Sequence, residues 1–174
     1  MLAFTGHHAV ATDVPEPWIR GRLDPDDLGS PTKAGFLDAL GRKVGGRPGS
    51  LDVVLVASAV STGSSALQRV EPTRHPRAER ALQYRTDVRV YERDDGAGVL
   101  ILGRGLAGRW EAAIEVDPRY AGRGIGRELC RAARSLCPDR EPVWAQVAAG
   151  NAASLRTVLA AGFVPVGSEV LFVP

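Results

Sequence analysis

The sequence predicts an α/β fold in which helices flank a mixed sheet, and three observations support this prediction. Short apolar segments typical of strands alternate with segments of helical spacing along the 174 residues. Residues 87–116 hold three strand-like segments joined by tight turns, which predicts an antiparallel meander. The third segment leads directly into a glycine-rich turn and an amphipathic helix at residues 125–136. A chain of this length can bury one sizeable core, so we expect a single domain.

The N-terminal part is predicted to contain a strand, two helices and a longer strand. Residues 2–12 form the first strand, Asp13 is the expected cap of a short helix, and Thr32 is the expected cap of a second helix that continues to Val44. Residues 51–60 are an apolar run rich in Val, which is typical of a strand buried on both faces. The side chains expected on the inner helix faces are Trp18, Ile19, Leu23, Phe36, Leu37, Leu40 and Val44.

The middle of the chain is predicted to form a loop, a helix and the meander. Residues 62–74 are polar and weakly patterned, which predicts a mobile loop. A helix follows at residues 76–84, with Pro76 in its first turn and with Ala78, Ala81 and Leu82 facing inward. The meander strands are expected at residues 88–92, 99–106 and 109–116.

The C-terminal part is predicted to contain two helices, one strand between them and two closing strands. The first helix has one apolar stripe, and the second begins at Asn151, a good N-cap, and ends at Gly162 in the left-handed conformation. The stripe of the first helix is Ile125, Leu129, Ala132, Ala133 and Leu136. The expected inner face of the second helix is Leu155, Val158, Leu159 and Gly162. The strands are expected at residues 142–147, 164–167 and 170–173.

The turn before the first of these helices has the composition of an anion-binding site. Pro118 ends the strand, and three glycines allow a sharp turn with no Cβ beside a bound group. A helix that begins here offers unpaired backbone N–H groups and the positive end of its dipole, and Arg123 and Arg127 flank it. The glycines are Gly122, Gly124 and Gly126. The alternative interpretation is a tight strand-to-helix turn without a ligand.

Two common nucleotide motifs are excluded at this turn. The dinucleotide fingerprint G-x-G-x-x-G fails because its third glycine position is Arg127, and the chain has no G-K-[ST] sequence of a P-loop.

The motifs around the turn resemble those of the GNAT superfamily of N-acetyltransferases. Val-Asp-Pro at residues 116–118, followed by Ala-Gly-Arg-Gly-Ile-Gly at residues 121–126, resembles motif A, which runs V-x-P and then [RQ]-x-x-G-x-[GA]. Ala121 departs from this pattern, since the family prefers Arg or Gln there. The strand at residues 142–147, the helix that Asn151 opens and the closing Gly-Phe at residues 162–163 resemble motif B. The two motifs occur in the family's order within residues 87–174.

The resemblance implies a GNAT-like acyl-CoA N-acyltransferase fold, in which the meander is followed by two parallel strands that splay apart. Residues 1–174 would form one such domain. Within it, residues 87–174 would be the acetyl-CoA-binding core. The divergent residues 1–86 would lie on the acceptor side, as a lid or as a small extra lobe.

The family's cofactor contacts can be carried onto this chain residue by residue. The backbone of residues 114–116 would bind the pantetheine arm, residues 122–127 would bind the pyrophosphate, and Asn151 would lie beside the arm. The residues concerned are Ile114, Val116, Gly122, Arg123, Gly124, Ile125, Gly126, Arg127 and Asn151.

Catalysis in this interpretation depends mainly on positioning, with one carboxylate as the base. Glu115 is the candidate general base and Glu111 shares its strand face. The alternative is that both are solvated carboxylates or partners of Arg109. Val158 stands where the family often has a Tyr that acts as the acid, so the usual acid is absent.

The sequence therefore predicts an acetyl-CoA-dependent N-acyltransferase that acts on a primary amine of a small molecule or protein. Two alternatives stay open: a catalytically weak acyl-CoA-binding sensor or partner module, and a phosphate binder outside the family. A net charge of +2 gives no electrostatic case for nucleic acid. No metal site is expected from the histidines, since His7 and His8 alternate on a strand and only His75 remains.

The sequence also predicts a cytoplasmic protein, a monomer or homodimer, without membrane attachment. No basic leader or apolar run of about 20 residues is present. Cys130 and Cys137 are seven positions apart on one predicted helix, about 10 Å along its axis. This separation is beyond disulfide reach, so both are expected to be small buried side chains.

Overall fold

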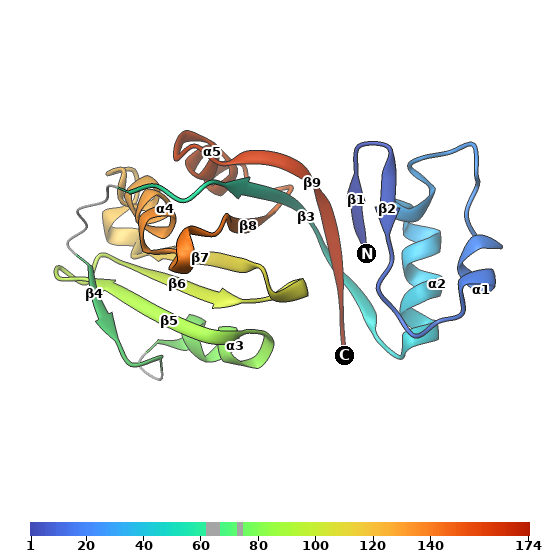
Figure 1. Cartoon of the computed structure of the whole chain (residues 1–174), viewed down its shortest axis with the longest axis horizontal. Coiled ribbons are helices and arrows are strands. Elements are labelled where there is room, and N and C mark those ends of the chain that lie inside the picture. The colour runs from blue at the N-terminus through green and yellow to red at the C-terminus, as the bar shows by residue number, and fades with distance from the viewer. Residues whose placement is uncertain (62–66, 73–74) are drawn as a thin grey trace. The chain divides into compact units, whose positions relative to one another are not determined.

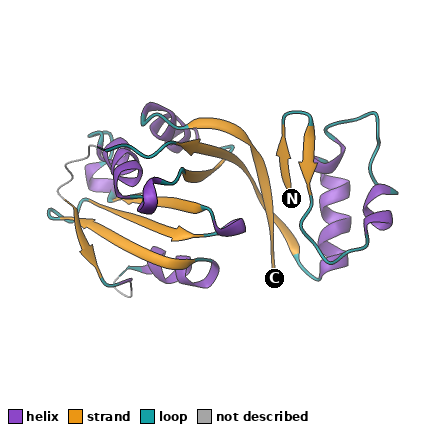
Figure 2. Cartoon of the chain, viewed as in Figure 1, coloured by secondary structure: helices purple, strands orange, loops and turns teal. Residues whose placement is uncertain are grey.

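The computed structural model describes residues 1–61, 67–72 and 75–174. The chain forms two compact units, a terminal unit of Met1–Val54 with Val166–Pro174 and a central unit of Leu55–Pro165. It passes between them within strand β3 (Arg47–Ala57) and within strand β9 (Val164–Val173). Both units combine helices with strands (Figure 2), which confirms the predicted mixed α/β class.

The terminal unit packs its helices on strands in the order β2-β1-β9-β3. Its remaining elements are β1 (Leu2–Phe4), β2 (His7–Ala9), α1 (Glu16–Arg20), the 3₁₀ turn η1 (Ser30–Thr32) and α2 (Ala34–Val44). The core of the unit joins α2 to β9, and the helix-face residues Trp18, Ile19 and Leu23 pack against it as predicted. The buried residues are Met1, Phe36, Leu37, Leu40 and Val170.

Several expectations for this unit are wrong in detail. The predicted strand at residues 2–12 is a hairpin, because Gly6 adopts a φ of 80° and reverses the chain. The caps lie one or two residues later than predicted, at Pro15 and Lys33 rather than Asp13 and Thr32. The two predicted closing strands are the single strand β9, and Val44 is exposed.

The central unit contains the meander and the glycine turn. Its strand order is β8-β7-β6-β5-β4, antiparallel except between β7 and β8. The strands are β4 (Leu67–Val70), β5 (Thr86–Arg93), β6 (Gly98–Arg104), β7 (Trp110–Val116) and β8 (Val143–Ala148). The helices are α3 (Pro76–Tyr84), α4 (Ile125–Leu136) and α5 (Ala152–Ala160). Short 3₁₀ turns are η3 (Leu106–Gly108), η4 (Pro118–Tyr120) and η5 (Pro138–Arg140).

Within this unit the helices cover both faces of the sheet (Figure 1). On one face, Ala78 and Ala81 of α3 are buried with Val90, Val99 and Ile101 of the meander. On the other face, α4 approaches β6 so closely that a Cβ at Gly98 would lie 2.9 Å from Leu129 and 3.2 Å from Ile125. Because adjacent strand residues point to opposite faces, β6 is buried over almost its whole length.

Most predicted elements of this unit are confirmed, except for the loop at residues 62–74 and the inward orientation of two leucines. The predicted loop at residues 62–74 contains strand β4, and residues 62–66 and 73–74 lie outside the described residues. Leu82 and Leu159, expected on inner helix faces, are exposed. Helix α5 begins at the predicted cap Asn151, and Gly162 at its end has a φ of 88°, as expected. Helix α4 begins after the predicted glycine turn, with Gly124 as its N-cap residue.

Candidate functional site

Strands β7 and β8 run parallel but pair only at their beginning. The register joins Trp110 to Val143 and Glu111 to Trp144, and within the described part of the chain it continues no further. On its other edge β7 stays paired with β6 from Trp110 to Val116. The edge of β7 that faces β8 therefore carries backbone N–H and C=O groups without a strand partner over residues 112–116. This is the predicted separation of the two strands.

The glycine turn lies at the end of this open segment. Asp117 begins η4 by accepting a hydrogen bond from the Arg119 N–H at 2.9 Å. Gly122 and Gly124 adopt φ values of 78° and 84°, where a side chain would be strained. A Cβ at Gly122 would meet no atom within 4 Å, so its surroundings are open.

Helix α4 begins at Ile125, and no side chain among the described residues caps its N-terminus. The N–H groups of a first helical turn have no partner inside the helix, so within the described residues those of α4 have no side-chain cap in place of one. Together with the positive end of the dipole, they form a site suited to a phosphate.

Gly126 has a different role from the other two glycines. A Cβ there would lie 3.1 Å from Thr157 of α5, 3.5 Å from Ile114 and 3.7 Å from Val116. Gly126 therefore lets α4 pack closely on β7 and α5. The side chains of Ile114 and Val116 lie near the Gly126 position of α4. The Asp117 N–H donates to the Ala97 carbonyl on the β6 side, so the alternation of the ladder directs the backbone N–H and C=O groups of Ile114 and Val116 to the opposite, open edge.

Arginines near the turn differ in how they are held. Arg119 forms an ion pair with Asp117, Nη2 to Oδ2 at 2.5 Å, and this pair holds the pKa of Asp117 below its usual value. Arg123 lies over the ring of Tyr120, 5.3 Å from the centroid. The Arg127 guanidinium folds back so that it would lie 3.8 Å from a Cβ at Gly124. Arg123 and Arg127 are both exposed.

On the facing helix, Asn151 caps α5 by accepting a hydrogen bond from the Ser154 N–H at 3.1 Å. Its own N–H donates to the Ala148 carbonyl at 2.8 Å, so the turn after β8 is fixed. Val158 is buried in the packing of α5 and presents no proton donor.

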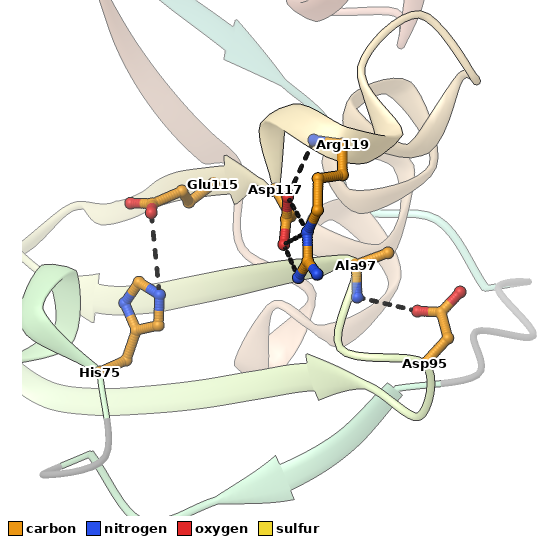
Figure 3. A network of polar contacts seen from close by, with 6 residues as sticks. All are labelled: His75, Asp95, Ala97, Glu115, Asp117 and Arg119. Atoms are coloured by element: carbon orange, nitrogen blue, oxygen red, sulfur yellow. Dashed lines mark hydrogen bonds and ion pairs between the residues drawn. The ribbon is translucent and has the colours of Figure 1, made fainter.

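Glu115 projects from β7 toward the beginning of α3 (Figure 3). Its Oε2 accepts a hydrogen bond from Arg77 Nε at 2.8 Å, and its Oε1 lies 3.9 Å from His75 Nε2. The Glu115 side chain remains 48% exposed, so its carboxylate is accessible to solvent.

Glu111 is buried and bound within the fold. It pairs with Arg85 at 3.0 Å and with Arg109 at 2.8 Å, and it accepts a hydrogen bond from the Leu106 N–H. A Cβ at Gly105 would overlap its carboxyl group. The alternative that these carboxylates are partners of Arg109 is thus confirmed for Glu111, whereas Glu115 contacts Arg77 and His75.

His75 and Arg77 were missed as site residues by sequence reasoning. The available signal was a helix start with Pro76 at its first position. That signal predicts a helix cap at this point of the chain. It does not predict that His75 and Arg77 contact the carboxylate of Glu115, which lies 38 or more positions later.

Other reactive side chains lie away from this site. Burial raises the pKa of the Cys130 thiol to about 12 and that of Cys137 to about 11, as expected for packed cysteines. Among the described residues, no group of His, Cys, Asp and Glu side chains gathers as a metal site would require. In the same residues, no helix is both long and apolar enough to cross a bilayer.

Comparison with known proteins connects this geometry to one family. Residues 72–163 match the sequence model of the Acetyltransferase (GNAT) family, which is more than half of the chain. The matched range contains the separated strands, the glycine turn and α5. A comparison with curated proteins gave no match.

Three solved structures resemble this chain at low sequence identity, and one of them has a TM-score above 0.5. A GNAT-family protein from Novosphingobium aromaticivorans is 21% identical with a TM-score of 0.51, over 74% of this chain and 66% of that one. A GCN5-related N-acetyltransferase from Sphaerobacter thermophilus is 16% identical with a TM-score of 0.48, over 80% and 56%. A functionally unknown protein from Staphylococcus epidermidis is 15% identical with a TM-score of 0.48, over 79% and 66%. The alignments thus cover between 56% and 66% of these three chains.

Proposed function

This chain belongs to the GNAT acetyltransferase family, and we propose that it transfers an acetyl group from acetyl-CoA directly to a primary amine of a small molecule or protein. The observation that carries the proposal is the open edge of β7 over residues 112–116 beside the uncapped start of α4. An extended ligand arm with an anionic end fits such an edge and such a helix start.

In this proposal the cofactor is bound mainly by backbone groups. The pantetheine arm pairs with the backbone of Ile114 and Val116, and the pyrophosphate accepts hydrogen bonds from the N–H groups of Ile125, Gly126 and Arg127. Gly122 and Gly124 keep the turn open, and Asn151 holds the facing turn after β8. Arg123 and Arg127 add charge, which offsets the absence of a long side chain at Ala121.

The chemistry requires one proton to leave the acceptor before attack. Glu115 takes this proton from the acceptor ammonium, because its carboxylate is half-exposed and lies on the strand with the open edge. The free amine then attacks the thioester carbonyl, and a backbone N–H of β7 stabilises the oxyanion. The thiolate can leave without a dedicated acid, because its conjugate thiol has a pKa of about 8.5 by analogy with Cys. The thiolate then takes the second proton, which the nitrogen loses as the amide forms.

A second candidate function is an acyl-CoA sensor or partner module with weak catalysis. Two observations favour keeping it: Val158 is buried where the family often has an acid, and Ala121 lacks a phosphate-binding side chain. Loss of a general acid costs about 10²–10⁴ in rate, which is compatible with a slow enzyme or with a sensor.

The wider setting of the activity is also proposed. We place the protein in the cytoplasm, as a monomer or homodimer that binds neither nucleic acid nor membrane. Residues 1–174 act as one domain, in which residues 87–174 bind acetyl-CoA and residues 1–86 contribute the acceptor side.

Two measurements test the proposal. Acetyl-CoA in large excess over its dissociation constant should raise the melting temperature, since a ligand that binds the native state stabilises it. Thiol release should then be measured over a panel of amines, with Glu115→Gln as the variant. Turnover that falls about 10²-fold or more in Glu115→Gln supports the enzyme. Binding without turnover on any amine favours the sensor, and absence of stabilisation contradicts both functions.

A further inference from the structure

The start of helix α3 contacts the carboxylate of Glu115 through Arg77 and through His75, and Figure 3 shows the His75 contact. We propose that His75 is a positioning residue that orients Glu115 for proton abstraction while it caps α3. This inference rests on the proposed function. It goes beyond it by assigning a role to a residue outside the motifs that resemble the family.

The hydrogen bond that His75 accepts at Nδ1 decides the tautomer of its neutral ring. Nδ1 accepts the backbone N–H of Arg77 at 3.2 Å, so Nδ1 carries no proton. In a neutral imidazole the proton is then on Nε2, the atom that faces Glu115 Oε1 at 3.9 Å. His75 therefore presents a donor, and not a base, to the carboxylate.

Arg77 and His75 contact different oxygens of the Glu115 carboxylate. Arg77 Nε donates to Oε2 at 2.8 Å, which leaves Oε1 as the oxygen with the weaker contact. The 3.9 Å gap between Oε1 and Nε2 is too long for a direct hydrogen bond but suits one water about 2.8 Å from each atom.

In the reaction Oε1 receives one proton from the acceptor ammonium, which becomes the free amine. The resulting carboxylic acid later returns that proton to solvent. His75 keeps Oε1 turned toward the open edge of β7. Its side chain is 21% exposed, less than half as much as that of Glu115, so it is held more firmly than the group that it orients.

Two substitutions of His75 distinguish its role as the N-cap of α3 from its contact with Glu115. His75→Asn keeps an acceptor for the Arg77 N–H, because Asn is a good N-cap, but it removes Nε2. His75→Gln keeps an amide donor near the position of Nε2 but lacks the short capping acceptor. We expect His75→Asn to retain the melting temperature and the stabilisation by acetyl-CoA while kcat falls about tenfold. We expect His75→Gln to melt earlier while kcat stays near the wild-type value.

The opposite pattern would overturn the inference. If kcat follows the melting temperature, with His75→Gln slow and His75→Asn normal, His75 is only a cap. If the wild-type chain turns over no amine, the proposed function fails and this inference fails with it. Wild-type turnover that His75→Asn leaves unchanged removes this inference alone.

A nitrogen NMR measurement reads the same contact without turnover. The chain has 3 histidines, so the His75 imidazole signals can be assigned by their loss in His75→Asn. The neutral ring should carry its proton on Nε2, and Glu115→Gln should move the His75 signals but leave those of His7 and His8 in place. A proton on Nδ1, or no response to Glu115→Gln, contradicts the assignment.

Discussion

Two glutamates on the same face of β7 illustrate how position decides what a residue does. Glu111 is buried between Arg85 and Arg109, whereas Glu115 is half-exposed beside Arg77. The spacing of four residues predicts the shared face, but it does not predict the difference in burial. That difference comes from Arg85, which lies 26 positions earlier and becomes a neighbour only through the fold.

We expect Glu111→Ala to lower the free energy of unfolding by about 3 kcal/mol, because it leaves two nearly buried guanidinium groups without their shared carboxylate. Glu115→Ala is the matched control and should cost less than about 1 kcal/mol, since its ion pair is exposed. Urea unfolding of the two variants measures both values. Equal losses would show that Glu111 is not the structural member of the pair.

The arginines of the glycine turn give a second test at this scale. Arg127→Ala should weaken acetyl-CoA binding about tenfold, because a charge-assisted hydrogen bond to the pyrophosphate is lost. Arg131→Ala, one turn further along α4 and also exposed, is the control and should bind normally. Calorimetric titration measures the two affinities. Equal affinities would place the phosphates elsewhere.

Among the elements, those with strong local signals were predicted best. Asn151 and Gly162 mark the ends of α5, and the Asp94–Gly98 turn marks the β5–β6 hairpin, since caps and turns depend on neighbouring residues. Strand β4 was missed because its four residues show no strand pattern by themselves. They form a strand through their pairing with β5. The hairpin at Gly6 was missed because its two strands are only three residues long.

Packing of α4 on β7 and α5 depends on the absence of a side chain at Gly126. We expect Gly126→Leu to cost about 2 kcal/mol of unfolding free energy, because the added atoms meet Thr157 and Ile114. Gly35→Ala in α2 is the control: a Cβ there meets nothing within 4 Å, so the variant should gain about 0.5 kcal/mol. Thermal or urea unfolding distinguishes these outcomes. A neutral Gly126→Leu would mean that α4 does not pack so closely.

The β5–β6 turn should respond to acid through Asp95. Hydrogen bonds from Arg93, and then from the Ala97 N–H, lower the pKa of Asp95 to about 2. A lowered pKa stabilises the fold above the ordinary value of 3.8, and this contribution is lost as the pH falls toward 2. The melting temperature of Asp95→Asn should therefore lie below that of the wild type at neutral pH, and the difference should vanish near pH 2. A difference that persists there would point to another cause.

At the scale of the whole molecule, sequence reasoning was most informative about the central unit. Both motifs lie there, and the order of strand, glycine turn and helix follows from local chemistry. The terminal unit takes its core from both ends of the chain, since Val170 packs with Phe36, Leu37 and Leu40. Contacts between segments so far apart in the sequence do not produce a local sequence pattern. For this reason the predicted strands and caps were wrong more often in the terminal unit.

The central claim is that the open edge of β7 and the start of α4 bind acetyl-CoA. Amide hydrogen exchange with and without acetyl-CoA tests it most directly, because exchange reports protection at individual backbone N–H groups. The proposal predicts slower exchange at residues 114–116 and 125–127 when acetyl-CoA is present, and no change in the terminal unit. Saturating acetyl-CoA that leaves both segments unchanged, or protects a different part of the chain, would contradict it.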